Sequence, residues 1–306
     1  MVTKAVIEGL SVRTGEKLWE SMIRSVLEYS TEVWGGGDWK QAEQIQNKVG
    51  RILLGLSKCA SGEVPRAELG WLSLKARRVF KQLLYWGKLI RMDDSRLVKN
   101  VYSECKKHTE NLKESFCGSV KRSLLDLKLG HLWVSEAIGD LKGWTSFIST
   151  AIRRRDTELW LQAVQKKKKL RLFKCLKTDV VREDFLEWNI PASHRAHYAR
   201  LRSGTHQLRL ETGRRAHEKE EERLVYVTGT ESHFLLECYV YNRLREGMFE
   251  KINQLTGYNH LTMRDNKDWM MDVLLGHGLK RKEVREQIGK AVETLRAVAM
   301  RIRKQN

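Results

Sequence analysis

The sequence has very little proline, and its few cysteines are scattered. Only 2 prolines and 5 cysteines occur in 306 residues. The scarcity of proline excludes collagen-like and proline-rich linker architectures and favours helix over folds that depend on proline-marked turns. The cysteines are Cys59, Cys105, Cys117, Cys175 and Cys238. An odd, dispersed set without any Cys-x-x-Cys pair is typical of a reducing compartment rather than of a disulfide framework.

Long apolar runs are also missing. No stretch approaches the roughly 18 apolar residues that a membrane-spanning helix needs. The first ten residues, MVTKAVIEGL, do not combine a basic segment with an apolar core as a secretory signal does. We therefore expect a soluble intracellular protein, in the nucleus or the cytoplasm, that has no membrane partner.

Negative charge is in short supply as well. The chain carries 57 Lys and Arg against 38 Asp and Glu, a formal net charge of +19. An excess of this size attracts polyanions, although it says nothing about the fold. An apolar fraction of 41% is enough for a hydrophobic core, and the length corresponds to about two domains.

Apolar spacing predicts a mainly α fold. Apolar residues recur at intervals of three and four over 18–34, over 42–56 and over 72–90, which places them on one face of a helix. Three consecutive glycines, Gly35 to Gly37, end the first of these helices, so that the first two form an antiparallel helical hairpin. A long helix is expected over 145–176.

The pattern changes between residues 205 and 238. Apolar and polar residues alternate after Thr205, and the segments RLVYV (223–227) and SHFLLEC (232–238) flank a Thr-Gly-Thr turn. Alternation on both sides of a short glycine-containing turn is typical of a hairpin. We therefore predict a small β-hairpin near 205–238.

A last long helix is expected over 280–304. Its apolar residues follow heptad spacing. They are Val284, Ile288, Ala291, Leu295, Val298 and Ile302. Packing within the chain and self-association through 280–304 both remain open for this stripe.

The densest basic segment lies between Arg153 and Lys174. It holds nine cations against two acids, a net charge of +7 over 22 residues. The cations are Arg153, Arg154, Arg155, Lys166, Lys167, Lys168, Lys169, Arg171 and Lys174. Cations that follow phosphates, interleaved with aromatics such as Trp160 that stack on bases, are typical of single-strand binding. A nuclear-localisation-like cluster, or a soluble helix face with Trp160 in its buried stripe, remain the alternatives.

Motifs for catalysis are absent from the sequence. It contains no Gly-x-x-x-x-Gly-Lys loop and no Gly-x-Gly-x-x-Gly pattern. Asp93 and Asp94 follow Met92 like the Met-Asp-Asp of a polymerase, but they close an amphipathic helix, and we expect Asp94 to cap the next one. We predict no enzyme activity and no cofactor.

Several segments together resemble a known family. They include LWESMIRSVLEYSTEVWGG from Leu18, AEQIQNKVGRILLGLS from Ala42, LRSGTHQLRLETGR from Leu201 and ESHFLLEC from Glu231. These segments are similar to the C-terminal part of reverse transcriptases of non-LTR (LINE-type) retrotransposons. The resemblance implies a thumb-like helical hairpin over 1–60, a basic helical linker region over 61–176, and a knuckle region with the C-terminal helix over 177–306.

The resemblance also bears on activity and metal binding. The family's catalytic palm precedes the thumb, so a chain that begins at the thumb is expected to lack a polymerase centre. His233 and Cys238 match the last two ligands of the family's zinc knuckle. The two cysteines expected upstream, near Val225 to Thr228, are absent. Because a structural zinc site needs four ligands, we interpret His233 and Cys238 as a degenerate remnant that binds no metal.

These observations favour a non-catalytic nucleic-acid-binding remnant of a retrotransposon reverse transcriptase. The resemblance implies contact with template RNA, so RNA or single strands are favoured over duplex DNA. Two other interpretations stay open. The chain is alternatively a helical protein interaction or self-association module, or a degenerate open reading frame without a selected function.

Overall fold

The computed structural model describes residues 11–109, 114–206, 230–238, 241–257, 266–276 and 282–305. Within these ranges the protein is helical, and they contain no β-strand. The mainly α prediction is confirmed. None of the helices in these ranges has the length and apolarity that a bilayer crossing requires.

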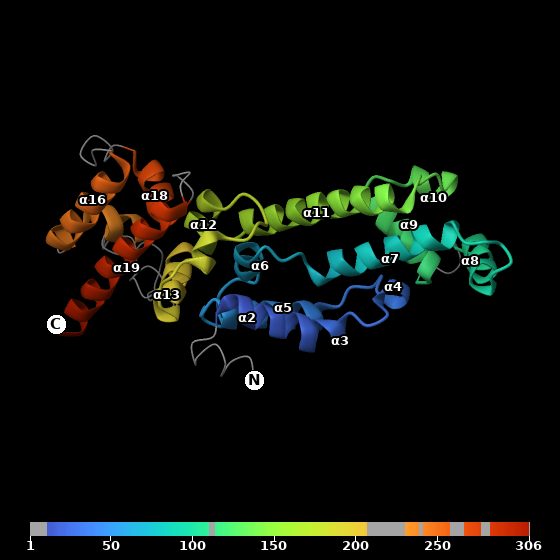
Figure 1. Ribbon diagram of the computed structural model, residues 1–306, viewed down its shortest axis with the longest axis horizontal. Coiled ribbons are helices and arrows are strands. Elements are labelled where there is room, and N and C mark those ends of the chain that lie inside the picture. Colours follow the sequence, from blue (N-terminus) through green and yellow to red (C-terminus); the bar gives the residue numbers. More distant parts are fainter. Residues whose placement is uncertain are drawn as a thin grey trace.

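The helices form an elongated assembly (Figure 1). The first half of the chain contains α2 (Val12–Leu18), η1 (Trp19–Arg24), α3 (Ser25–Leu27), α4 (Thr31–Trp34), α5 (Lys40–Leu53), α6 (Glu63–Leu69), α7 (Leu74–Ile90), α8 (Leu97–Lys107), α9 (Phe116–Asp126) and α10 (His131–Ser135). The second half contains α11 (Leu141–Gln165), η2 (Lys168–Leu170), α12 (Arg171–Leu176), η3 (Asp184–Glu187), α13 (Ala192–Arg202), η5 (His233–Glu237), α16 (Asn242–Thr256), α18 (Lys267–Leu275) and α19 (Lys282–Gln305). Helices α7 and α11 pack side by side along the long axis, with α8 to α10 near one end and α16, α18 and α19 at the other.

The predicted hairpin of the first two helices is present in modified form. The helix that we expected over 18–34 is interrupted. α2, η1 and α3 follow one another without a break as far as Leu27, and a turn at Glu28 to Ser30 separates them from α4. The glycine turn then docks on α7, where the buried Arg78 donates to the carbonyl oxygens of Gly35 and Gly37. A Cβ on Gly36 would lie 1.6 Å from Ser119 Oγ of α9, so only glycine allows this close approach.

The β-hairpin prediction is wrong. The segment SHFLLEC, expected as its second strand, instead contains the π-helical turn η5. Phe234, Leu235 and Leu236 are all buried there, which a strand with one solvated face would not allow. The first expected strand lies outside the described residues.

Two separate groups of buried residues form the core. The smaller one joins α7, from Ala76 onward, with α8, α9, α10 and the first half of α11. The larger one joins the N-terminal hairpin, α6 and the second half of α11 to the C-terminal helices. The larger group therefore draws side chains from all three of the ranges 1–60, 61–176 and 177–306.

Helix α11 connects the two groups because its buried stripe repeats every four residues. The buried positions are Trp144, Ile148, Ile152, Asp156, Trp160 and Val164. A period of four exceeds the 3.6 residues of a helical turn, so the buried face rotates along the helix. The first three side chains belong to the smaller group and the last two to the larger one.

Asp156 lies where this stripe passes from one group to the other. Its carboxylate accepts from Arg66 Nη2 at 2.8 Å and from Ser73 Oγ at 2.6 Å, and its Oδ2 also accepts from the Ser73 backbone N–H at 3.1 Å. The acid therefore connects α6, the start of α7 and α11. Burial of a carboxylate is tolerated here because its oxygens have charged and polar partners.

The predicted C-terminal helix is confirmed as α19. Its Ile288 and Leu295 are buried, and Val284 and Ala291 pack against the larger core group. A Cβ on Gly289 would lie 1.9 Å from the Trp188 ring, so that this indole rests directly on the helix backbone. The described part of the stripe, from Val284 to Leu295, thus packs within the chain, against α16, α18 and α13, and this favours the intramolecular alternative over self-association.

Candidate nucleic-acid interface

The first basic triplet lies in the middle of α11. Arg153 and Arg154 are exposed, and the Arg154 side chain is 82% accessible. Arg154 Nε donates to Glu158 Oε1 at 3.1 Å, an i,i+4 pair on the surface that contributes little stability. Arg153 makes no hydrogen bond or ion pair with any residue that the structure describes. Both side chains are therefore available to an external anion.

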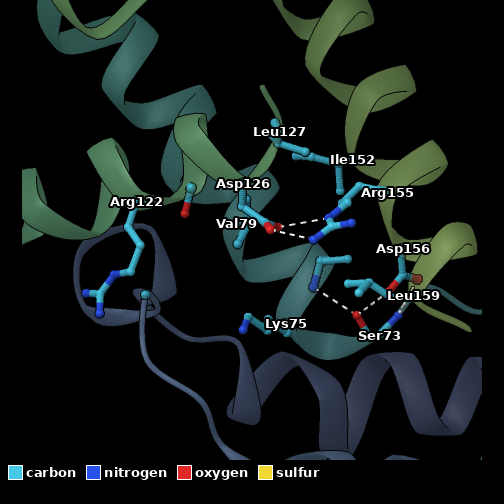
Figure 2. Close-up of a pocket in the computed structure, with 13 residues that line it drawn as sticks. Ser73, Lys75, Val79, Arg122, Asp126, Leu127, Ile152, Arg155, Asp156 and Leu159 are labelled. Atoms are coloured by element: carbon cyan, nitrogen blue, oxygen red, sulfur yellow. Dashed lines mark hydrogen bonds and ion pairs between the residues drawn. The ribbon is translucent and has the colours of Figure 1, made fainter. Parts of the chain in front are cut away.

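Arg155 points in another direction and contacts α9. Its guanidinium makes two hydrogen bonds with Asp126, from Nη2 at 2.7 Å and from Nε at 3.2 Å. The hydrogen bond with the Asp126 carboxylate raises the pKa of Arg155. This residue still lies at the surface, at the rim of a cavity between α7, α9 and α11 (Figure 2).

The second basic segment does not continue α11 as predicted. The expected helix over 145–176 ends at Gln165 and resumes as η2 and α12. Where a helix ends, its last carbonyl oxygens lack backbone partners and attract cations. Lys174 Nζ donates to the Gln165 carbonyl oxygen at 2.7 Å, and Lys169 Nζ donates to that of Cys59 at 3.1 Å. Lys174 thus stabilises the end of α11, and Lys169 links η2 to the loop before α6.

Two further cations of this segment form ion pairs within the chain. Lys167 Nζ donates to Glu63 Oε2 at 2.5 Å and to Ser61 Oγ at 2.8 Å. Arg171 Nη2 donates to Glu231 Oε2 at 2.5 Å. Of the segment's lysines, Lys166 and Lys168 are exposed and make no hydrogen bond or ion pair with the described residues.

The Arg171 pair includes a buried carboxylate. Glu231 is 3% exposed and also hydrogen-bonds with His206 Nε2 at 2.7 Å. Burial by itself raises the pKa of Glu231, but the His206 hydrogen bond and the nearby His206 and Arg171 charges outweigh it and lower the pKa to about 2. Arg171 therefore stabilises the fold near the start of η5.

Trp160 does not fit the stacking role that we predicted for it. Its side chain is 1% exposed, and the indole Nε1 donates to the Glu63 carbonyl oxygen at 3.0 Å. Phe173 packs edge-on against its ring at 6.3 Å. Because both rings are buried, neither offers a face to a base.

The sequence analysis missed an exposed aromatic on the same helix. Phe147 is 49% exposed and lies against Trp144, with the ring centroids 6.1 Å apart. It precedes Arg154 by seven residues, which puts the two on one face of α11. This seven-residue spacing between Phe147 and Arg154 is the signal in the sequence that indicates the pair.

The knuckle remnant is partly described. His233 lies in η5, and neither ring nitrogen has a hydrogen-bond partner, although Nδ1 is 3.7 Å from Glu237 Oε2. Cys238 is buried. The described part of the chain holds no group of three His, Cys, Asp or Glu residues suited to a metal ion. The positions near Val225 to Thr228 lie outside it.

The Met-Asp-Asp segment lies at an exposed turn between α7 and α8. Asp93 Oδ1 accepts from the Ser95 backbone N–H at 2.9 Å, and hydrogen bonds with Ser95 lower the pKa of Asp93. The cap expected from Asp94 is wrong, since α8 begins after Arg96 without a side-chain cap. Asp93 thus stabilises the turn.

Comparison with protein-family models, with curated proteins and with solved structures finds no match to this chain. The resemblance to LINE-type reverse transcriptases therefore remains a hypothesis that rests on the sequence segments quoted above. Function has to be argued from the surface itself.

Proposed function

We propose that this protein binds RNA or another single-stranded nucleic acid by contacting the phosphate backbone of the strand, without sequence preference. The binding surface consists of four cations, Arg153, Arg154, Lys166 and Lys168, which we call the exposed cation set. Sequence-independent affinity arises when such side chains neutralise phosphates and release counterions. The proposal includes no catalytic step.

A single observation carries this proposal. Some of the nine cations between Arg153 and Lys174 bind carboxylates or carbonyl oxygens of the chain, whereas others reach solvent without such a partner among the described residues. Arg153, Lys166 and Lys168 have no partner in the described chain, and Arg154 has only the exposed Glu158. Nearby Phe147 supplies the exposed ring that Trp160 does not, and aromatic stacking accepts any base.

The choice of RNA rests on the sequence resemblance. If the chain corresponds to the thumb, linker and degenerate knuckle of a LINE-type reverse transcriptase, contact with a template strand is the expected residual capacity. A self-association module is the weaker alternative, since the described part of the α19 stripe, from Val284 to Leu295, packs inside the chain.

Fluorescence anisotropy with a labelled single-stranded RNA oligomer across a salt series tests the proposal. Four neutralised phosphates, at roughly −0.7 each, give a slope of log K against log salt of about −3. Changing Arg153, Arg154, Lys166 and Lys168 together to Gln should remove most of that slope. Circular dichroism should be unchanged, because these side chains make no buried contact.

A matched variant controls for net charge. Arg13, Lys17, Lys48 and Lys58 are four exposed cations of the N-terminal hairpin and its following loop. Their replacement by Gln removes the same charge and should leave the slope nearly unchanged. Equal loss of slope in both variants would mean that attraction is spread over the whole basic surface, and the proposed site would be wrong.

A further inference from the structure

A cavity lies between α7, α9 and α11, lined on α11 by residues that flank Arg153 and Arg154 in sequence. Its volume is about 380 Å³, within the range of roughly 300–1,000 Å³ typical of small-molecule sites. Figure 2 shows the Arg155–Asp126 pair and the Ser73–Asp156 pair among the residues that line the cavity. Binding sites of this kind combine apolar walls with a few placed polar groups.

Apolar residues from α7, from α11 and from the position after α9 form part of the cavity wall. Val79 of α7, Leu127 just after α9, and Ile152 and Leu159 of α11 line it. Leu159 is 43% exposed, although it lies on a helix whose other exposed positions are mostly polar. An apolar wall that remains open to solvent suits a planar, weakly polar ring, which would cover it on binding.

Polar groups in the cavity can form hydrogen bonds with the edge of such a ring. The Asp126 oxygens each accept one hydrogen bond from Arg155, and a carboxylate has about four acceptor positions in all. The remaining positions can accept from a base amino group or a ribose hydroxyl. Asp156 adds no unbalanced negative charge, because Arg66 and Ser73 already bind its carboxylate.

Two cations at the rim suit a phosphate. Lys75 pairs with Asp38 at 2.7 Å and Arg122 with Glu114 at 3.4 Å, and all four side chains are more than half exposed. Exposed pairs of this kind contribute little and exchange partners readily. A phosphate offers both cations a stronger, charge-assisted acceptor than these carboxylates do.

We propose that this cavity binds one nucleotide unit, with the base against Val79 and Leu159 and the phosphate on Lys75 and Arg122. The inference rests on the proposed function, in which the bound strand supplies that nucleotide. A free nucleoside monophosphate has the same chemistry and is the alternative source. The cavity adds a discrete, saturable pocket to a surface that otherwise binds only phosphates.

Calorimetric titration of the full chain with AMP, ribose 5-phosphate and inorganic phosphate tests the cavity directly. AMP should bind in a saturable manner, whereas the other two should bind at least about tenfold more weakly because they lack the base. Ser123→Leu, which fills the cavity from α9, should abolish AMP binding. Arg122→Gln should weaken it about tenfold, and Arg13→Gln, at an exposed arginine of the N-terminal hairpin that does not line the cavity, should leave it unchanged.

Each outcome separates this inference from the proposed function. If inorganic phosphate binds as tightly as AMP, or if Ser123→Leu keeps AMP binding while circular dichroism shows the native helix content, the nucleotide pocket is wrong. Competition of AMP with the labelled RNA identifies the strand as the source, and simultaneous binding of both identifies the free nucleotide. A normal salt slope without any AMP binding overturns the pocket and leaves the proposed function intact. AMP binding without any RNA binding overturns the proposed function alone.

Discussion

The two basic segments of this protein differ in how many of their cations bind partners within the chain. Arg153 and Arg154 lie on a continuous helix, whose backbone carbonyl oxygens are already bonded, and their side chains reach solvent. Lys167, Lys169 and Lys174 lie where the helix ends, and they bind a carboxylate and two backbone carbonyl oxygens. The comparison teaches that the carboxylates and carbonyl oxygens within reach of each cation, more than charge density, decide which cations are available to a partner.

Removal of Asp156, which follows the first basic segment directly, should have the largest effect on the stability of the fold. Asp156→Ala leaves the partly buried Arg66 without its ion-pair partner, and breaking a buried pair in this way costs about 3 kcal/mol or more. Urea unfolding measures this loss. Glu158→Ala, which removes only the exposed partner of Arg154, is the matched control and should change stability by less than about 0.5 kcal/mol. A similar loss in both variants would contradict the structural role of Asp156.

Lowering the pH should reduce the stability that the ion pair between Arg171 and Glu231 gives to the second segment. The pKa of Glu231 is about 2 in the folded protein against 4.5 for an ordinary Glu. A lowered carboxyl pKa stabilises the fold fully above about 4.5, and this contribution, about 3 kcal/mol at most, is lost as the pH falls from there toward 2.

The matching variant is Arg171→Gln, measured by urea unfolding at pH 6 and pH 3. It removes one of the charges that lower the pKa of Glu231, so the pKa should rise. The difference in stability between the two pH values should therefore shrink. An unchanged difference would show that Arg171 does not stabilise the Glu231 carboxylate.

Two pairs of neighbouring lysines provide the sharpest test of the comparison. Lys167→Gln with Lys169→Gln should lower stability by about 1 kcal/mol and leave the salt dependence of RNA binding unchanged. Lys166→Gln with Lys168→Gln should leave stability unchanged and lower the salt slope by about 1.4, at roughly 0.7 per phosphate. Anisotropy and urea unfolding on both variants give the two readouts. If the two pairs behave alike, the division within the second segment is wrong.

The smallest expected effect concerns the aromatic on the face of the first segment. Phe147→Ala should weaken RNA binding about fivefold, the lower end of what one stacked base contributes. The salt slope should not change, because no phosphate contact is lost. Val134→Ala, at a more exposed apolar position on α10, is the control and should bind RNA as the unchanged protein does.

Sequence periodicity predicted the regular helices and failed where the pattern is ambiguous. The expected helices over 72–90 and 280–304 correspond to α7 and α19 because their apolar spacing fits only a helix. SHFLLEC is different, since a short apolar run satisfies both a strand and a buried helical turn. Three consecutive residues, Phe234, Leu235 and Leu236, are buried, and this is consistent with a helical turn rather than with a strand that has one solvated face. The end of α11 at Gln165 was missed because lysines, unlike glycine or proline, do not mark a helix end.

The sequence by itself determined the helical class, the positions of the long helices and the basic surplus between Arg153 and Lys174. These follow from spacing and composition, which act locally along the chain. Only the tertiary structure decided which cations are free, because Glu63, Glu231 and the Cys59 carbonyl come from distant parts of the chain. The same holds for Trp160, whose burial depends on α6, and for the cavity, which needs three helices at once. Partners far apart in sequence leave no trace in local spacing, so their effect on a surface becomes visible only in the fold.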